Sequence, residues 1–455
     1  MINFSNIKCV HFIGIGGIGN SAIAEILMNS GIEITGSDIK ESGITENLKN
    51  KGAKIFIGHS KNNISNPDLV VYSSAISEDN EERLETKKLE IMEVNRAEIL
   101  GTLMSTYDTS IAISGTHGKT TTTSMITSIF NDLNLDPTSL IGGNLESIHG
   151  NVLIGNSNIF ITEACEYKEN FLNLKPTYGI ILNIEEDHLD YYDNLEHIIN
   201  AFIKFSKNIK PNGALIVNND DYNTKRIHQY IETKIVTVGI IQDSDYQAKN
   251  ITFNSLGYPT FEIYNSSKVL AKCTLNVPGM HNIYNALAAI ALSNFFEEDL
   301  NNITDKLSLF KGVHRRFENM GKYNKAIIID DYAHHPTEIK ATLSTAKKMD
   351  KERIVGVFQP HTFSRTKELL SEFATSFSDA DEIIVTDIYA AREENIYNIS
   401  SNDLVNEINK EKKNVKYIST LDECEKYLKD TISDGDLVIM LGAGSIRTLS
   451  ENLVK

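Results

Sequence analysis

The chain has 455 residues, more than the roughly 250–300 at which one hydrophobic core stops growing, so two or three domains are expected. A hydrophobic fraction of 41% and a charged fraction of 23% fit folded globular domains and argue against long disordered stretches. Lysine and arginine total 44 against 61 aspartate and glutamate residues, and the net charge of −17 argues against a nucleic-acid partner bound through a basic face.

The sequence also predicts a compartment. No apolar run approaches the roughly 18 residues that span a bilayer, and the first residues lack the basic and long apolar regions of a secretory signal. Four cysteines lie far apart and form no CxxC pair, which argues for a reducing compartment and against a structural zinc site. We therefore expect a cytoplasmic protein without a membrane partner, as a monomer or a weak homodimer.

Short apolar runs typical of buried strands alternate along the chain with longer helix-like stretches. The runs cover residues 9–13, 111–114, 159–163, 178–183, 214–218, 326–330, 354–359, 382–386 and 437–441. This alternation is typical of βαβ units and parallel sheets, whereas residues 258–272 predict a β-hairpin. We predict an α/β fold with domains at 1–105, 106–310 and 311–455.

A strand-to-helix junction near the start carries the pattern G-x-G-x-x-G, formed around Gly14, Gly16, Gly17 and Gly19. The glycines permit a tight turn, and the following helix presents free N–H groups and a positive dipole end to a diphosphate. The next predicted strand ends at Asp38, where a carboxylate is placed to accept a ribose hydroxyl. The motif alone fits NAD, FAD or a nucleotide sugar, and it also fits a tight turn that binds nothing.

A second predicted strand runs into another glycine-rich turn and a threonine-rich helix. This segment comprises Gly115, Thr116, His117, Gly118, Lys119, Thr120 and Thr121. It is two residues shorter than the P-loop pattern G-x-x-x-x-G-K-[ST], but the same chemistry predicts an ATP or GTP site. Lys119 would neutralise the β- and γ-phosphates and the Thr120 hydroxyl would reach Mg²⁺. Two such turns in one chain predict an enzyme that couples ATP cleavage to a reaction on a nucleotide-bearing substrate.

Candidate metal ligands follow two later predicted strands. Glu163 stands at the end of one strand, with Glu166 as a weaker candidate three residues on. His188 lies in a carboxylate-rich loop after the next strand. This spacing does not match a zinc site, so we expect phosphate-bound Mg²⁺ or Mn²⁺.

Taken together, the motifs resemble those of the Mur ligases of peptidoglycan synthesis. The matching segments are residues 11–19, 73–76, 115–122, 163–166, 187–190, 279–285, 314–318, 330–338 and 359–366. They follow the family's order through nearly the whole chain, which is far more specific than either turn alone.

The resemblance implies an N-terminal Rossmann-like domain for a UDP-sugar, a central P-loop-type ATPase domain and a C-terminal Rossmann-like domain for an amino acid. It implies that ATP, with Mg²⁺ or Mn²⁺, phosphorylates the carboxylate of UDP-N-acetylmuramate. The amine of L-alanine then attacks the acyl phosphate and expels phosphate. On this interpretation the first turn holds a UDP-sugar rather than NAD.

The resemblance also implies roles at matching positions. The UDP-sugar would contact Gly14, Gly16, Gly17, Gly19, Asp38, Ser73 and Ser74. ATP would contact the second turn together with Asn282, Asn285, Arg316 and Asp331, and the metal would contact Thr120, Glu163 and His188. The amino-acid pocket would comprise Tyr332, His334, His361 and Arg365. Lys119, His334 and Arg365 are the predicted catalytic residues, with His334 as a candidate base by residue type and Arg365 as the partner of the alanine carboxylate.

Two positions receive no such role. Ser445 stands where the family commonly has aspartate, so no role is assigned to it. Several Mur ligases use a carbamoylated lysine for a second metal, and no segment of this chain identifies one.

Three alternative functions fit part of the pattern. A related Mur ligase could add a preformed peptide, although Tyr332 favours the enzyme for a single amino acid. An NAD-dependent oxidoreductase would leave Lys119 without a role. A nucleotide-gated binding module would release phosphate without regard to UDP-sugar or amino acid.

Overall fold

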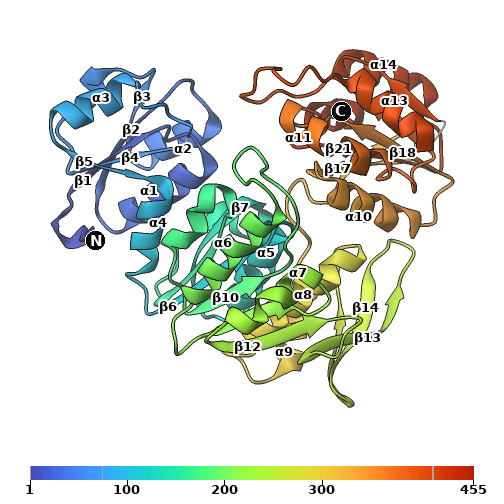
Figure 1. The fold of residues 1–455 in the computed structure, drawn as a ribbon, viewed down its shortest axis with the longest axis horizontal. Coiled ribbons are helices and arrows are strands. Elements are labelled where there is room, and N and C mark those ends of the chain that lie inside the picture. The colour runs from blue at the N-terminus through green and yellow to red at the C-terminus, as the bar shows by residue number, and fades with distance from the viewer. Residues whose placement is uncertain (1, 74, 412–413) are drawn as a thin grey trace.

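The computed structural model describes residues 2–73, 75–411 and 414–455, so the predicted contact Ser74 lies outside the described residues. The chain folds into three α/β domains, each built on its own sheet. In Figure 1 the blue N-terminal domain and the orange-to-red C-terminal domain both adjoin the central, mainly green-to-yellow domain. The predicted three-domain α/β architecture is confirmed.

The N-terminal domain contains a five-stranded parallel sheet in the order β3-β2-β1-β4-β5. The strands are β1 (Cys9–Ile13), β2 (Glu33–Asp38), β3 (Lys54–Ile57), β4 (Leu69–Tyr72) and β5 (Met92–Asn95). The helices are α1 (Ile18–Asn29), α2 (Gly43–Asn50), α3 (Glu81–Lys88) and α4 (Arg96–Met104). β1 lies in the middle of the sheet and is buried, so the turn after it sits at the carboxyl edge between two neighbouring strands.

The central domain contains a ten-stranded mixed sheet in the order β15-β14-β13-β12-β11-β10-β6-β9-β7-β8. The strands are β6 (Thr109–Ser114), β7 (Thr138–Leu145), β8 (Gly150–Leu153), β9 (Ile159–Glu163), β10 (Tyr178–Ile181), β11 (Ala214–Asn218), β12 (Lys234–Gly239), β13 (Tyr246–Phe253), β14 (Pro259–Asn265) and β15 (Lys268–Thr274). The helices are α5 (Lys119–Asp132), α6 (Leu195–Lys207), α7 (Tyr222–Ile227), α8 (Met280–Ser293) and α9 (Leu300–Leu307). β14 and β15 are antiparallel, which confirms the predicted hairpin.

The C-terminal domain contains a six-stranded sheet in the order β16-β17-β21-β18-β19-β20, parallel except for the edge strand β16. The strands are β16 (Glu318–Tyr323), β17 (Ala326–Asp331), β18 (Arg353–Phe358), β19 (Glu382–Val385), β20 (Val415–Tyr417) and β21 (Asp436–Leu441). The helices are α10 (Pro336–Lys347), α11 (Phe363–Glu368), α12 (Leu370–Ala374), α13 (Ser401–Glu411), α14 (Leu421–Thr431) and α15 (Arg447–Val454).

The nine predicted apolar runs all fall on strands, and their ends agree with the strand ends to within two residues. The run 178–183 is the clearest case, because β10 ends at Ile181 and Asn183 turns away to hydrogen-bond the second glycine-rich turn. Predicted limits at 105 and 310 fall between the sheets and stay predictions. Among the described helices, none combines the length and the apolar character needed to cross a membrane.

Candidate active site

The first glycine-rich turn links β1 to α1 and is held by the end of β2. Gly14 has a φ of +78°, a left-handed conformation that favours glycine. Its N–H and that of Ile15 both donate to the carbonyl oxygen of Ser37, at 2.9 and 3.0 Å. Gly16 N–H donates to Asp38 Oδ2 at 2.8 Å, so the carboxylate predicted for a ribose hydroxyl also fastens the turn. Helix α1 then begins at Ile18, and its N-cap residue Gly17 provides no side-chain cap, which leaves the positive end of the helix available to an anion.

A cation that the sequence analysis missed lies beside this turn. A Cβ atom placed on Gly19 would come within 2.8 Å of Arg96 Nη1, so the guanidinium lies against the start of α1. Ser73, after β4, also lies close to this turn, because a Cβ on Gly14 would be 3.3 Å from Ser73 Cβ. The signal for Arg96 was its position directly after a strand of the same parallel sheet.

The second turn links β6 to α5 and is tied to the segment after β10. Gly118 has a φ of +87° and caps α5 through its backbone alone. Asn183 fixes the turn, since its side chain accepts the His117 N–H at 2.7 Å and donates to the His117 carbonyl oxygen at 3.1 Å. The threonine-rich first turn of α5 is buried, and Lys119 and Thr120 line a cavity.

Lys119 is paired with a buried carboxylate. Its Nζ donates to Glu166 Oε1 at 2.9 Å and to the Thr116 carbonyl oxygen at 3.1 Å. Burial alone would lower the pKa of Lys119, but the Glu166 carboxylate raises it above its ordinary value. The lysine is therefore a fixed positive charge at neutral pH, held directly beneath the second glycine-rich turn.

The predicted metal ligands Thr120, Glu163 and His188 line one cavity of about 730 Å³. Glu163 is positioned by the Gly142 N–H, which donates to its Oε1 at 2.6 Å. His188 Nε2 lies 3.8 Å from Glu166 Oε1, and the other oxygen of Glu166 is buried without a hydrogen-bond partner among the described residues. Oxygen donors, one imidazole and an unused buried carboxylate oxygen fit a divalent cation such as Mg²⁺ or Mn²⁺.

An adjoining cavity of about 170 Å³ is lined by four residues predicted to contact ATP. Asn282, Asn285, Arg316 and Asp331 all line it. Asn282 donates to the Pro278 carbonyl oxygen at 2.7 Å and accepts from Asn285 at 3.0 Å, so both amides are fixed on one face of α8. Burial raises the pKa of Asp331 to about 6 against the opposing effect of Arg316. The structure thus brings residues of the central and third domains to one shared cavity.

The residues predicted for the amino acid also lie close together. His334 and His361 have ring centroids 5.9 Å apart, and Tyr332 lies 5.3 Å from His334. Arg365 Nη1 donates to the His361 carbonyl oxygen at 2.9 Å. Burial lowers the pKa of His334 to about 3, with Arg365 adding to the effect, so the imidazole is neutral. Its Nδ1 donates to the Tyr332 carbonyl oxygen at 2.9 Å, which leaves Nε2 as an acceptor.

An ion pair across the domain junction holds this pocket against the central domain. Arg365 Nη2 donates to Asp187 Oδ1 at 2.9 Å. Burial alone would raise the pKa of Asp187, but the Arg365 guanidinium holds it well below its usual range. The predicted partner of the alanine carboxylate is therefore bonded to a carboxylate of the chain, and sequence reasoning did not assign Asp187 that role.

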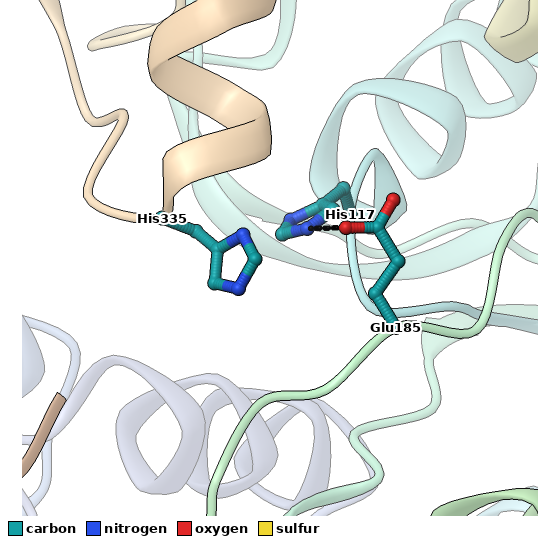
Figure 2. Close-up of side chains that lie close together, drawn as sticks. All are labelled: His117, Glu185 and His335. Carbon is teal, nitrogen blue, oxygen red and sulfur yellow. Dashed lines mark ion pairs between the residues drawn. The ribbon is translucent and has the colours of Figure 1, made fainter. Parts of the chain in front are cut away.

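A second junction contact surrounds His117 of the second glycine-rich turn. Figure 2 shows His117 beside Glu185 of the central domain, with His335 approaching from the start of α10. The His117 nitrogens lie 3.5 Å from Glu185 Oε2 and 3.3 Å from Glu338 Oε1. Burial alone would lower the pKa of His117, but these two carboxylates raise it to about 9. The imidazolium thus joins the central domain to the C-terminal domain.

Three of these side chains, His117, Glu185 and His335, bring potential metal-binding atoms within 4.8 Å of one another. Both nitrogens of His335 are already used, because Nε2 donates to the Glu186 carbonyl oxygen at 3.0 Å and Nδ1 accepts the Thr337 N–H at 3.3 Å. We therefore interpret the cluster as an interdomain contact and not as a metal site.

Comparison with known proteins identifies the family. Residues 9–108 match the model of the Mur ligase family catalytic domain, 113–293 the Mur ligase middle domain and 315–444 the Mur ligase glutamate ligase domain. The chain is 49% identical over 448 residues to a UDP-N-acetylmuramate–L-alanine ligase of Alkaliphilus metalliredigens, covering 98% of this chain and 97% of the relative. The chain belongs to the Mur ligase family.

Solved structures of Mur ligases extend this likeness to three dimensions. The UDP-N-acetylmuramate–alanine ligase of Thermotoga maritima superposes with a TM-score of 0.82 at 32% identity, covering 99% of this chain and 98% of that one. A murein peptide ligase of Psychrobacter arcticus reaches a TM-score of 0.73 at 24% identity, covering 98% of each chain, which shows a shared fold alone.

Membership of the Mur ligase family, whose members depend on ATP, excludes the NAD-dependent oxidoreductase as an alternative. The second glycine-rich turn lies within the matched middle domain. The matched glutamate ligase domain contains Tyr332, His334, His361 and Arg365. Sequence reasoning missed Arg96, Asp187, Glu185 and Glu338, all of which act through tertiary contacts. The individual site roles stay predictions.

Proposed function

We propose that this chain joins L-alanine to the carboxylate of UDP-N-acetylmuramate, with cleavage of ATP, in the cytoplasmic synthesis of peptidoglycan precursors. The proposal rests on the 46–50% identity to UDP-N-acetylmuramate–L-alanine ligases over nearly their whole length. The geometry supports it, because one cavity is lined by Ile18 of the first domain, Lys119 of the second and Tyr332 of the third. Three substrates held by three domains can meet there.

The proposed reaction has two steps. A carboxylate oxygen of the muramate attacks the γ-phosphorus of ATP, the bond to the β-phosphate oxygen breaks, and ADP leaves. The alanine nitrogen then attacks the acyl carbon, loses a proton, and expels inorganic phosphate as the amide forms. Both substrates supply their own reactive atoms, so the protein acts by positioning and by stabilising charge.

Lys119 would reduce the electrostatic repulsion between the two anionic reactants of the first step. The carboxylate and the γ-phosphate are both anionic and repel each other at bonding distance. The lysine is held at the base of the turn by Glu166 and backbone carbonyls, and the amino end of α5 lies beside it. The fixed ammonium and the helix N–H groups would stabilise the charge that concentrates between the reactants.

Thr120, Glu163 and His188 would hold a divalent cation at this cavity, and Glu166 has an unused oxygen in reach of the same space. Such a cation neutralises phosphate charge and polarises the oxygen atoms that are transferred. The chain's own part is to keep these ligands in place, which the Gly142 hydrogen bond does for Glu163.

The third domain would receive the amino acid. Arg365 would exchange its bond to Asp187 for the alanine carboxylate, to which its planar fork is suited. His334 Nε2 would accept a hydrogen bond from the amine and so aim the nitrogen at the acyl carbon. A pKa near 3 makes His334 a weak proton acceptor, and we propose that the amine proton passes to solvent.

The decisive experiment measures phosphate release with ATP and Mg²⁺ while UDP-N-acetylmuramate is offered with a panel of amino acids and a tripeptide. We expect release that requires both UDP-N-acetylmuramate and L-alanine, with a new amide detected by mass spectrometry. Preference for the tripeptide would assign the chain to peptide addition. Phosphate release at the same rate with or without UDP-N-acetylmuramate and amino acid would contradict the proposal and favour a nucleotide-gated binding module.

A further inference from the structure

The first glycine-rich turn depends on the last two residues of β2. Three successive N–H groups, of Gly14, Ile15 and Gly16, donate to Ser37 and Asp38. A displacement of Ser37 would therefore move the backbone that is predicted to carry the diphosphate. The contacts that hold Ser37 in place are therefore expected to affect substrate binding.

A buried carboxylate on α3 holds the Ser37 side chain. Glu82 is 0% exposed, and its Oε2 accepts the Ser37 hydroxyl at 2.5 Å. Its other oxygen accepts the Asn63 amide at 2.5 Å and the Ser60 N–H at 3.3 Å. Two histidines lie beside it, with His11 Nε2 at 3.7 Å and His59 Nδ1 at 3.4 Å from Oε2.

This carboxylate keeps its charge despite complete burial. Burial alone would raise the pKa of Glu82, but interactions with His11, Ser37 and Asn63 lower it to about 2. An ionised acceptor forms stronger hydrogen bonds than a neutral one. Because β1, β2 and the segment after β3 all supply its partners, Glu82 fastens three neighbouring parts of the sheet at the edge where the turn lies.

The next residue of α3 supports the other side of the turn. Arg83 donates from Nη1 to the Ile76 carbonyl oxygen at 3.3 Å and pairs with Glu93 at 2.8 Å. Its guanidinium also lies 3.8 Å from the Tyr72 ring centroid. The segment it holds touches the turn, since a Cβ on Gly14 would be 3.5 Å from Ile76 Cδ1. Adjacent buried charges on one short helix thus brace both flanks of the turn.

We propose that Glu82 is a positioning residue for UDP-sugar binding, acting through Ser37 on the first glycine-rich turn. The inference rests on the proposed function, in which this turn receives the diphosphate. Glu82 does not touch the substrate, so its loss affects the affinity for one substrate and leaves the chemical step intact. A side chain that serves only general stability would change all substrates alike.

The test compares Glu82→Gln with Glu81→Gln, which removes an exposed carboxylate one residue earlier on the same helix. For Glu82→Gln we expect the KM for UDP-N-acetylmuramate to rise on the order of tenfold, because a charged hydrogen bond to the turn support is lost. The KM values for ATP and alanine and kcat at saturation should stay at the wild-type level. Calorimetry should show the same loss of affinity for the UDP-sugar, and Glu81→Gln should match wild type.

A second variant guards against a folding defect in the first. Ser37→Ala removes the hydroxyl that donates to Glu82 and that also contacts His59 Nδ1 at 3.0 Å. In the double variant the loss of UDP-sugar affinity should be smaller than the sum of the two single losses, because both changes disrupt the contact between Glu82 and Ser37. Effects that add, or an equal rise in the KM for all three substrates, would overturn the inference. If wild type itself failed to bind the UDP-sugar, the proposed function would be wrong instead.

Discussion

The two glycine-rich turns start their helices similarly but prepare differently for phosphate. In the first, the N–H groups of Gly14, Ile15 and Gly16 are bonded within the domain. In the second, Lys119 lies beneath the turn and donates a hydrogen bond to Glu166, and the turn itself is hydrogen-bonded to Asn183. Only the second turn carries its own cation, whereas the first relies on α1 and on Arg96 from another strand end.

This difference fits the two proposed tasks, which are binding of the UDP-sugar diphosphate at the first turn and transfer of a phosphate from ATP at the second. A diphosphate that stays intact needs a binding site of fixed shape and favourable electrostatic potential, which a rigid backbone and a helix N-terminus supply. A phosphate that is transferred gains charge density during the reaction and needs a cation aimed at it. Changes at the two turns should therefore separate binding from turnover, and the predictions below test that separation.

The largest effect is expected for Lys119→Ala. Loss of the ammonium should lower turnover by about 10²–10³ or more, since one preorganised charge-stabilising donor is removed. Phosphate release measures the rate, and calorimetry should show that UDP-sugar affinity is unchanged. The double variant Lys119→Ala/Glu166→Gln separates the lost cation from the orphaned buried carboxylate, because it should regain stability without regaining turnover. Near-normal turnover in Lys119→Ala would refute the assignment.

A smaller effect is expected when a glycine in either turn is replaced by alanine, and each replacement should raise the KM for a different substrate. Gly118 and Gly14 both have left-handed φ values, so a Cβ costs about 1–2 kcal/mol at either site. At Gly118 it would also lie 2.5 Å from Asn285 Oδ1. Gly118→Ala should raise the KM for ATP on the order of tenfold or more and spare the UDP-sugar, and Gly14→Ala should do the reverse.

Gly43→Ala serves as the matched control for these variants. Gly43 begins α2, lacks the left-handed conformation, and has open space where a Cβ would stand. Its kinetic constants should equal those of wild type. An equal rise in KM for ATP and for the UDP-sugar in either turn variant would show that the two binding sites are coupled and not separate.

The smallest effect concerns the domain junction at His117. Its pKa of about 9 exceeds the ordinary 6.5, so the junction contact is complete below pH 6.5 and is lost as pH rises through about 9. NMR titration of the ring protons should give a midpoint near 9, and Glu185→Gln should lower it. Glu196→Gln, which removes an exposed carboxylate, is the control. A wild-type midpoint near 6.5 would contradict the ion pairs.

Local sequence patterns determined the elements. Apolar runs such as 9–13 and 159–163 coincide with β1 and β9, because a strand buried on both faces of a parallel sheet reads as continuous hydrophobic residues. The glycine turns were equally visible, since a positive φ at Gly14 and Gly118 leaves a residue-type signal. Spacing then indicated which residues begin helices near phosphate.

Only the tertiary structure decided which side chains share a site. From the sequence, Glu166 was a weak candidate metal ligand, and in the structure it pairs with Lys119. Asp187 and Glu185 belonged to a carboxylate-rich loop in the sequence, and in the structure they take part in the contacts between the central and C-terminal domains. Glu82 gave no local signal at all. A helix or strand repeats along the chain and so marks the sequence, but the partner of a buried charge is chosen by distance in space, and contacts such as Glu82 with Ser37 join residues 45 positions apart.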